Sequence, residues 1–139
     1  GISARKRTLV DAGVLEEYLI DVYYARKLGV EPTGGGTSNL TLAPGTRNAE
    51  SIITSVDNGI FVTSILGGNA DSTTGDFSHG IAGFEIVKGN LGRPIGEMNV
   101  TGSHRELWGR LAEVGNDPHP YSSWRLPTLV FDGLSVSGT

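Results

Sequence analysis

The sequence contains no cysteine in 139 residues, which excludes disulfide bonds and thiolate metal ligands. Its apolar runs are short, and none approaches the roughly 18 residues that a membrane-spanning helix needs. No signal peptide is recognisable at its start. These absences favour a reducing compartment, and we expect a cytoplasmic protein with no membrane partner.

Concentrated positive charge is missing as well. The 11 Lys and Arg residues face 15 Asp and Glu residues, giving a formal net charge of −4. Binding to nucleic acid phosphates needs clustered basic side chains. The one short cluster, Arg5-Lys6-Arg7, is more typical of a solvated strand edge. We therefore expect no nucleic acid partner.

Glycine, in contrast, is abundant. The 21 glycines recur between short apolar runs, a pattern more typical of strands and turns than of a helix bundle. A chain of this length buries enough surface for one hydrophobic core. We predict a single α+β domain over residues 1–139, with a mixed or antiparallel, barrel-like sheet and about three short helices.

The stretch from Ser55 to Lys88 predicts two strands joined by a long loop. Between Gly67 and Gly80 nearly all residues are polar or glycine, and loops of this length are often functional or mobile. In the second strand, three apolar residues alternate and should share one face. The strand-forming residues are Ile60, Phe61, Val62, Ile65 and Leu66 before the loop, and Ala82, Phe84 and Ile86 after it.

Two readings fit the first 30 residues. Residues 4–10 alternate weakly and end at a turn, Asp11-Ala12-Gly13, after which residues 14–20 run back, and this predicts a hairpin with Gly13 at positive φ. Apolar residues between Leu15 and Val22 also fall at helical spacing, so one helix over residues 14–28 is the alternative. In the hairpin reading, a shorter helix runs from Asp21, its N-cap, to Leu28 and stops at Gly29.

Two further helices and three strands are predicted. Asn48 caps a helix with an apolar stripe, ended by Gly59, and Ser103 with Glu106 forms a capping box for a helix ended by Gly115. Strands are expected over 39–42, around 95–100 with a bulge near Gly96, and over 128–136 with a bend at 132–133. The expected apolar helix faces are Ile52, Ile53 and Val56 in the first, and Leu107, Trp108, Leu111 and Ala112 in the second.

Familiar catalytic and ligand-binding motifs do not occur. The three histidines, His79, His104 and His119, lie at no metal-ligand spacing, and no Gly-x-Ser-x-Gly elbow is present. The glycines of residues 32–37 lack the lysine of a phosphate-binding loop, and residues 69–75 lack the closing Glu of a calcium loop. Only His79, within the predicted polar loop, is a candidate functional side chain.

Several segments together resemble the C-terminal domain of the TldD/PmbA family, long called modulator of DNA gyrase, which comprises metallopeptidases and their partners. The resemblance covers the whole chain and rests on the order and spacing of its segments. In the central stretch these are Gly59-Ile60-Phe61-Val62-Thr63, Thr74-Gly75-Asp76-Phe77-Ser78, Gly83-Phe84 and Lys88-Gly89. Elsewhere they are Arg7-Thr8-Leu9-Val10, Gly13-Val14-Leu15, Tyr18-Leu19, residues 25–29, Ser38-Asn39-Leu40, residues 114–117 and Pro127-Thr128-Leu129.

One departure from the family pattern concerns zinc. Catalytic TldD-like members have a longer, glycine-rich stretch with a cysteine ligand where this chain has only residues 118–126. The resemblance is therefore to the PmbA branch, the non-catalytic partner, and it assigns no catalytic or metal residue here. Zinc is implied only for a TldD-like partner, or for an N-terminal domain, absent from this chain, that carries HExxxH in the catalytic branch.

The resemblance implies a role in proteolysis or peptide maturation. We expect a PmbA-like subunit that assembles with a TldD-like subunit, or with itself as a dimer, and helps to bind an extended peptide. Two alternatives remain: a zinc peptidase active in its own right, with His79 or Asp76 as a third ligand, or a structural assembly module. The candidate peptide-binding residues are Thr63, Leu66, Gly67, Gly68, Asp76 and His79.

Overall fold

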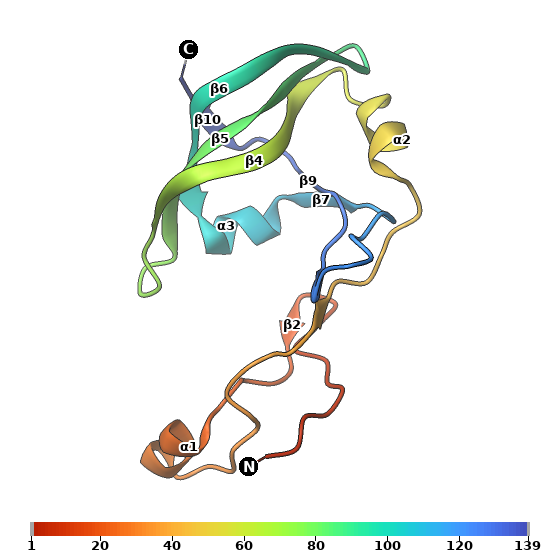
Figure 1. Ribbon diagram of the computed structural model, residues 1–139. Helices are drawn as coiled ribbons and strands as arrows, with labels where there is room; N and C mark the ends of the chain where they lie inside the picture. The colour runs from red at the N-terminus through yellow and green to blue at the C-terminus, as the bar shows by residue number, and fades with distance from the viewer. Residues whose placement is uncertain (1, 139) are drawn as a thin grey trace. The chain divides into compact units, whose positions relative to one another are not determined.

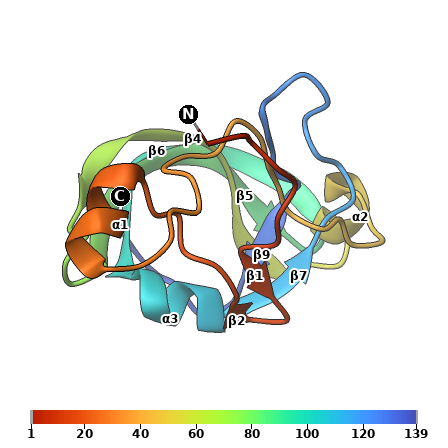
Figure 2. The same ribbon diagram turned by 90° about the horizontal axis from the view of Figure 1, so that it is seen from below.

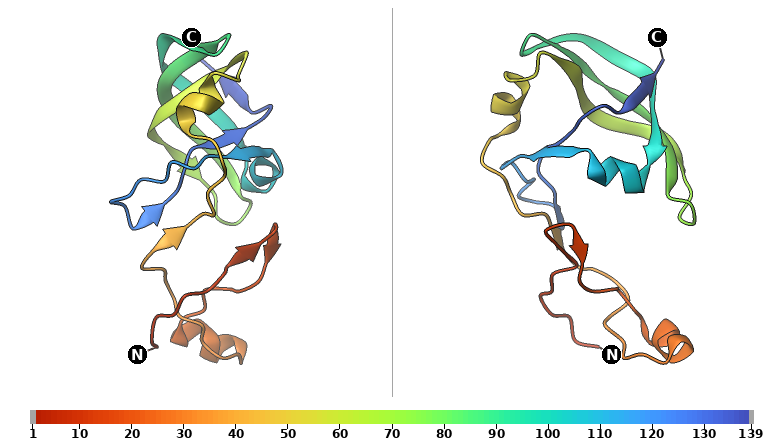
Figure 3. Two further views of the ribbon diagram at one scale, coloured as in Figure 1. Left: turned by 90° about the vertical axis from the view of Figure 1, so that its right-hand side faces the viewer. Right: turned by 180° about the vertical axis from the view of Figure 1, so that it is seen from behind.

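A computed structural model describes residues 2–138, which divide into two compact units near Leu40 (Figure 1). The first unit contains a short hairpin and one helix, and the second contains a four-stranded antiparallel sheet with two helices and several short strands. Further views show that this sheet is strongly twisted (Figures 2 and 3). The predicted strand-rich α+β class is confirmed.

The first unit opens with the predicted hairpin. Strands β1 (Val10–Asp11) and β2 (Val14–Leu15) pair antiparallel. Both turn residues have positive φ, 47° at Ala12 and 84° at Gly13, as a two-residue hairpin turn requires. The alternative helix over residues 14–28 is wrong, because β2 occupies its first residues.

Helix α1 (Val22–Leu28) begins and ends as predicted. The Asp21 carboxylate accepts a hydrogen bond from the Tyr24 amide at 2.7 Å, and Gly29 ends the helix in the left-handed conformation. Thr33 returns the chain to the start of the helix, since its hydroxyl accepts a hydrogen bond from the Ile20 amide at 2.9 Å. Ala25 is the buried residue of this helix.

The main sheet of the second unit has the strand order β10-β6-β5-β4. All its strand pairs are antiparallel. Its strands are β4 (Asn58–Ala70), β5 (Asp76–Val87), β6 (Asn90–Ser103) and β10 (Ser135–Ser137). Strand β4 therefore lies at one edge of the sheet, in yellow-green in Figure 1.

The predicted long loop between Gly67 and Gly80 is wrong. Strand pairing continues to Ala70 opposite Phe77, and only the segment from Asp71 to Gly75 turns the chain. The Asp71 carboxylate accepts hydrogen bonds from the amides of Thr73 at 2.7 Å and Thr74 at 3.2 Å, which closes the turn. These bonds also lower the pKa of the Asp71 carboxyl. The polar residues that suggested a loop are the solvated side chains of paired strands.

Strand β5 buries residues of both alternating sets, whereas a single apolar face was predicted. Phe77 and Ile81 are buried at odd positions and Ile86 at an even one, while Phe84 is 37% exposed. Successive residues of a strand point to opposite faces, so both faces of β5 contribute to the core. The predicted apolar face consists of Ala82, Phe84 and Ile86. Of these three residues, Ile86 alone is buried.

The connection from β5 to β6 is a tight turn. Lys88 and Gly89 both have positive φ, 50° and 75°, and the strands resume at Asn90 opposite Val87. The predicted bulge near Gly96 is also confirmed, because the pairing shifts between Ile81 opposite Met98 and Gly83 opposite Ile95. Two residues of β6 thus face one of β5.

Helix α2 (Ala49–Ile53) starts at the predicted cap but is shorter than expected. The Asn48 side chain accepts a hydrogen bond from the Ser51 amide at 2.9 Å. The helix ends at Thr54 rather than at Gly59, because Gly59 already lies in β4. Of the predicted apolar stripe, Ile52 is buried.

Helix α3 (His104–Gly109) ends well before the predicted Gly115. The residues that follow form strand β7 (Leu111–Val114), which pairs with β9 (Leu129–Phe131), so strand pairing overrides their helical spacing. Trp108, assigned to the buried face, is exposed and contacts Phe131 edge to face. Ser103 is the N-cap residue, as predicted, but its side chain makes no capping hydrogen bond.

The remaining strands are short. Strand β3 (Leu40–Thr41) matches the strand predicted over residues 39–42, and β8 is Trp124–Arg125. The predicted last strand is divided at Asp132 and Gly133 into β9 and β10, in agreement with the bend expected there. Arg47 and Glu113 join the α2 region to β7 by a two-point ion pair, with Nε to Oε1 at 2.8 Å, and this hydrogen bonding lowers the pKa of Glu113.

Candidate functional site

Four of the six predicted peptide-binding residues lie on β4, the edge strand. Thr63 and Leu66 sit where the β4–β5 register shifts, so each occupies a bulge. The Thr63 hydroxyl donates to the Ala82 carbonyl at 3.3 Å. Gly67 and Gly68 follow with φ of 134° and 148°, a backbone region open essentially to glycine alone. The bulges bend an edge whose outer side pairs with no other strand among residues 2–138.

His79 is the direct cross-strand partner of Gly68. A Cβ placed on Gly68 would lie 2.2 Å from the Ser78 carbonyl oxygen and 2.5 Å from the His79 Nδ1, so this position requires glycine. That nitrogen is buried and has no hydrogen-bond partner within the described chain. The imidazole stacks on Phe77 at 5.5 Å between ring centroids, and Phe77 also contacts His104 at 4.9 Å.

Asp76 does not join this group. It lies three positions from His79 on an unbroken part of β5, so the two side chains point to opposite faces of the sheet. Its partner is Ser103, at the far end of β6. The structure therefore brings together Leu66, Gly67, Gly68 and His79, leaves Thr63 at the neighbouring bulge, and places Asp76 beside the hairpin turn.

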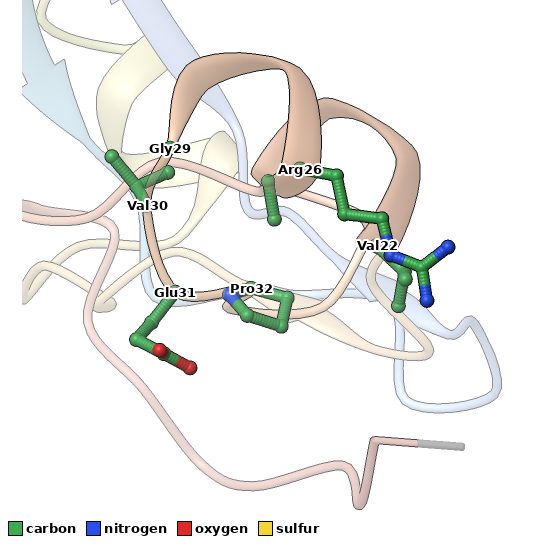
Figure 4. A pocket seen from close by; sticks show the side chains of 7 residues that line it. Val22, Arg26, Gly29, Val30, Glu31 and Pro32 are labelled. Carbon is green, nitrogen blue, oxygen red and sulfur yellow. The ribbon is translucent and has the colours of Figure 1, made fainter.

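A separate depression of about 420 Å³ lies beside α1 in the first unit (Figure 4). Its lining includes Val22, Ala25 and Arg26 from the helix and Glu31 and Pro32 from the segment after it. Arg26 and Glu31 are its only charged residues. This wide, open surface gathers no set of catalytic side chains, and the candidate site remains the β4 edge.

The chain was compared with protein families, curated proteins and solved structures. A family model described as the PmbA/TldA metallopeptidase C-terminal domain matches residues 1–138. The chain belongs to this family. The resemblance inferred from the sequence segments is thereby confirmed.

The relatives of this PmbA/TldA domain are named metalloproteases. A metalloprotease PmbA of Escherichia coli O157:H7 is 29% identical over 99% of the chain and 31% of its own length. A metalloprotease TldD homolog of Buchnera aphidicola subsp. Schizaphis graminum is 30% identical over 84% of the chain and 27% of its own length. The chain thus spans about a third of the length of the curated relatives it matches.

Two crystal structures contain the same fold. One, from Bacteroides thetaiotaomicron and named as a modulator of DNA gyrase, has 50% sequence identity and a TM-score of 0.96 over 100% of this chain and 32% of its own. Another of that description, from Thermotoga maritima, has 29% identity and a TM-score of 0.81 over 93% of this chain and 32% of its own. These values place both units of the PmbA/TldA domain within a known fold.

The zinc that the family name implies does not fit the residues of this domain. Within residues 2–138, no three His, Asp or Glu side chains gather as a ligand set would require. Neither His79 nor Asp76, the alternative third ligands, has two further ligand side chains beside it among these residues. We therefore derive no metal-dependent step for this chain. None of its described helices has the length and apolar character to cross a bilayer.

Sequence reasoning missed one residue of the site, Gly80. It is the cross-strand partner of Gly67 and lies at the predicted loop boundary. The signal lies in the turn: counting outward from the six residues 71–76, which separate the paired residues Ala70 and Phe77, places Gly67 opposite Gly80. The prediction of an unpaired polar loop hides this register.

Proposed function

We propose that this chain is the peptide-binding C-terminal domain of a PmbA-like subunit, which assembles with a zinc-bearing TldD-like subunit for proteolysis or peptide maturation. The β4 edge holds an extended peptide by adding it to the sheet as a further strand. Membership of the PmbA/TldA family supports the proteolytic context. Strand addition supplies backbone hydrogen bonds that tolerate varied peptide sequences.

The observation that carries the proposal is the absence of charge and proline on β4. Its 13 residues include no Asp, Glu, Lys, Arg or Pro. Natural edge strands are usually blunted by such residues, because an open row of backbone donors and acceptors pairs with other chains. An edge left uncharged over this length is suited to receive a strand.

The contrast with the other edge of the sheet strengthens this argument. Strand β10 pairs only with residues 99–101 of β6, which leaves residues 90–98 unpaired on that side by any described strand. This portion contains Pro94, the Arg93–Glu85 ion pair at 2.7 Å and Glu97 at a φ of 56°. Each of these features interferes with strand addition. The β4 edge contains neither proline nor a charged residue.

Exposed apolar side chains adjoin the β4 edge. Ile65 is 67% exposed and Leu66 59% exposed. The bulges at Thr63 and Leu66 interrupt a continuous ladder, so a bound peptide pairs with the regular stretches 58–62 and 67–70. Short ladders flanked by apolar contacts favour transient binding, as a substrate requires.

Charging the edge provides the test. We expect Asn69→Lys to weaken binding of an uncharged extended peptide of about nine residues by about tenfold, because lysine in a paired stretch of an edge strand opposes pairing. Isothermal titration calorimetry measures the affinity. Ser137→Lys, on the opposite edge strand β10, is the matched control and should bind as the unaltered protein does. Equal weakening by both substitutions, or no peptide binding at all, would contradict the proposal.

Assembly follows from the same uncharged edge and from the exposed apolar surface. We propose that the chain associates with a second copy when no TldD-like subunit is present. Strand pairing and apolar contacts between two copies persist or strengthen as salt rises, whereas contacts between charges weaken through screening. Sedimentation velocity from about 0.05 to 1 M salt measures the outcome. A monomer throughout the series, or a dimer that dissociates at high salt, would refute it.

A further inference from the structure

Two glycines face each other across the β4 edge. Gly67 in β4 pairs with Gly80 in β5, and paired residues of antiparallel strands project to the same face. A Cβ placed on Gly67 would meet no atom within 4 Å. The three atoms nearest to one placed on Gly80 would be the Leu66 Cβ at 3.6 Å, the Gly67 carbonyl oxygen at 3.7 Å and the Asn99 Oδ1 at 3.9 Å. We call this open space, bordered by Leu66 and Asn99, the glycine notch.

The notch is not a general property of this part of the hairpin. The next pair, Gly68 and His79, projects to the opposite face. There a Cβ on Gly68 would lie 2.2 Å from the Ser78 carbonyl oxygen and 2.5 Å from the His79 Nδ1, so no side chain fits at that position. On the notch face, the next pair is Asn69 and Ser78, both of which carry side chains. Of these three pairs, only Gly67 and Gly80 leave open space.

The notch opens at the edge where a strand would be added. A peptide residue directly opposite Gly67 projects its side chain to the notch face, within reach of both glycines. We infer that the glycine notch is a subsite for one aromatic side chain of an extended peptide. This inference rests on the proposed strand addition at β4 and specifies its selectivity.

Three features of the notch favour an aromatic occupant. The two glycines expose flat backbone, and an aromatic ring on a neighbouring strand covers such backbone from water. Leu66, more than half exposed, offers an apolar wall to one side of the ring. The lack of charge along β4 leaves a Lys, Arg, Asp or Glu side chain of the peptide without an ionic partner on that strand. Asn99 supplies a polar group at the inner end.

The test uses two capped, uncharged peptides of about nine residues that differ only at the central position, Phe in one and Ala in the other. We expect the Phe peptide to bind the unaltered chain about tenfold more tightly. Gly80→Ala fills part of the notch at ordinary contact distances and without positive φ, so the chain should fold. In this variant we expect the ratio of the Phe-peptide affinity to the Ala-peptide affinity to fall at least about threefold. The affinity for the Ala peptide should be nearly unchanged.

Gly92→Ala is the matched control, because its Cβ would also meet only ordinary contacts, 3.5 Å from the Glu85 Cβ, in a distant part of the sheet. It should keep the full preference for Phe. Amide chemical-shift changes confined to residues near Gly67 would confirm the location of the bound peptide. If both peptides bind equally well, or if Gly80→Ala leaves the ratio unchanged, the subsite is refuted while strand addition stands. If neither peptide binds, strand addition itself fails, and the subsite with it.

Discussion

We expect Gly83→Ala to destabilise the chain by about 3 kcal/mol, among the largest effects available to a single methyl group here. Gly83 is buried in β5, and a Cβ at this position would lie 1.9 Å from the Phe61 carbonyl oxygen and 3.0 Å from the Val62 Cα. These atoms belong to the backbone of β4, so no side-chain rotation relieves the overlap. The two central strands would have to separate, which disrupts the ladder on which the peptide edge depends.

Urea unfolding followed by circular dichroism measures this loss. Gly96→Ala is the matched control, because a Cβ there would meet nothing within 4 Å and no positive φ is involved. It should leave the free energy of unfolding unchanged within about 0.5 kcal/mol, or raise it slightly by restricting the unfolded chain. A Gly83→Ala variant as stable as Gly96→Ala would show that β4 and β5 lie farther apart than described.

Features set by local chemistry were predictable from the sequence. Asp21 and Asn48 cap their helices because each side chain reaches an amide three residues on, within the same segment. Gly13 and Gly89 adopt the positive φ values that their turns demand. In each case the residues that decide the structure adjoin it in the chain.

Features set by pairing between distant segments were not predictable in this way. The residues after Arg110 have apolar spacing compatible with a helix, but β9, which comes later in the chain, captures them as a strand. The polar residues of the β4–β5 hairpin appeared to be a loop because paired strands with solvated side chains lack an apolar signature. The candidate site also depends on pairing between distant segments. The β4–β5 register places His79 opposite Gly68, beside Gly67, but the Asp76 side chain points to the face opposite that of His79.

Asp117 lies at the junction of α2 and β9, and we expect Asp117→Ala to destabilise the chain by about 3 kcal/mol. Its carboxylate accepts hydrogen bonds from the Thr128 amide at 2.9 Å, the Thr128 hydroxyl at 2.8 Å and the Ala49 amide at 3.1 Å. Alanine would leave these three donors without their acceptor in a partly buried place. Urea unfolding measures the loss, and Asp132→Ala, at an exposed turn, should change stability by less than about 0.5 kcal/mol. Equal effects of the two substitutions would contradict the role given to Asp117.

The same contacts predict how stability depends on pH. Burial raises the pKa of the Asp117 carboxyl, but the hydrogen bonds from Thr128 and Ala49 outweigh burial, so its pKa in the folded chain is lower than usual. The unfolded chain therefore binds this proton more readily, and the stabilisation is complete above the ordinary Asp pKa of about 3.9. It is lost as pH falls through the lower, folded value. We expect the urea midpoint to fall more steeply below about pH 4 for the unaltered chain than for Asp117→Asn, which has no carboxyl at this position to protonate. Parallel pH profiles for the two proteins would show that Asp117 does not contribute to acid unfolding.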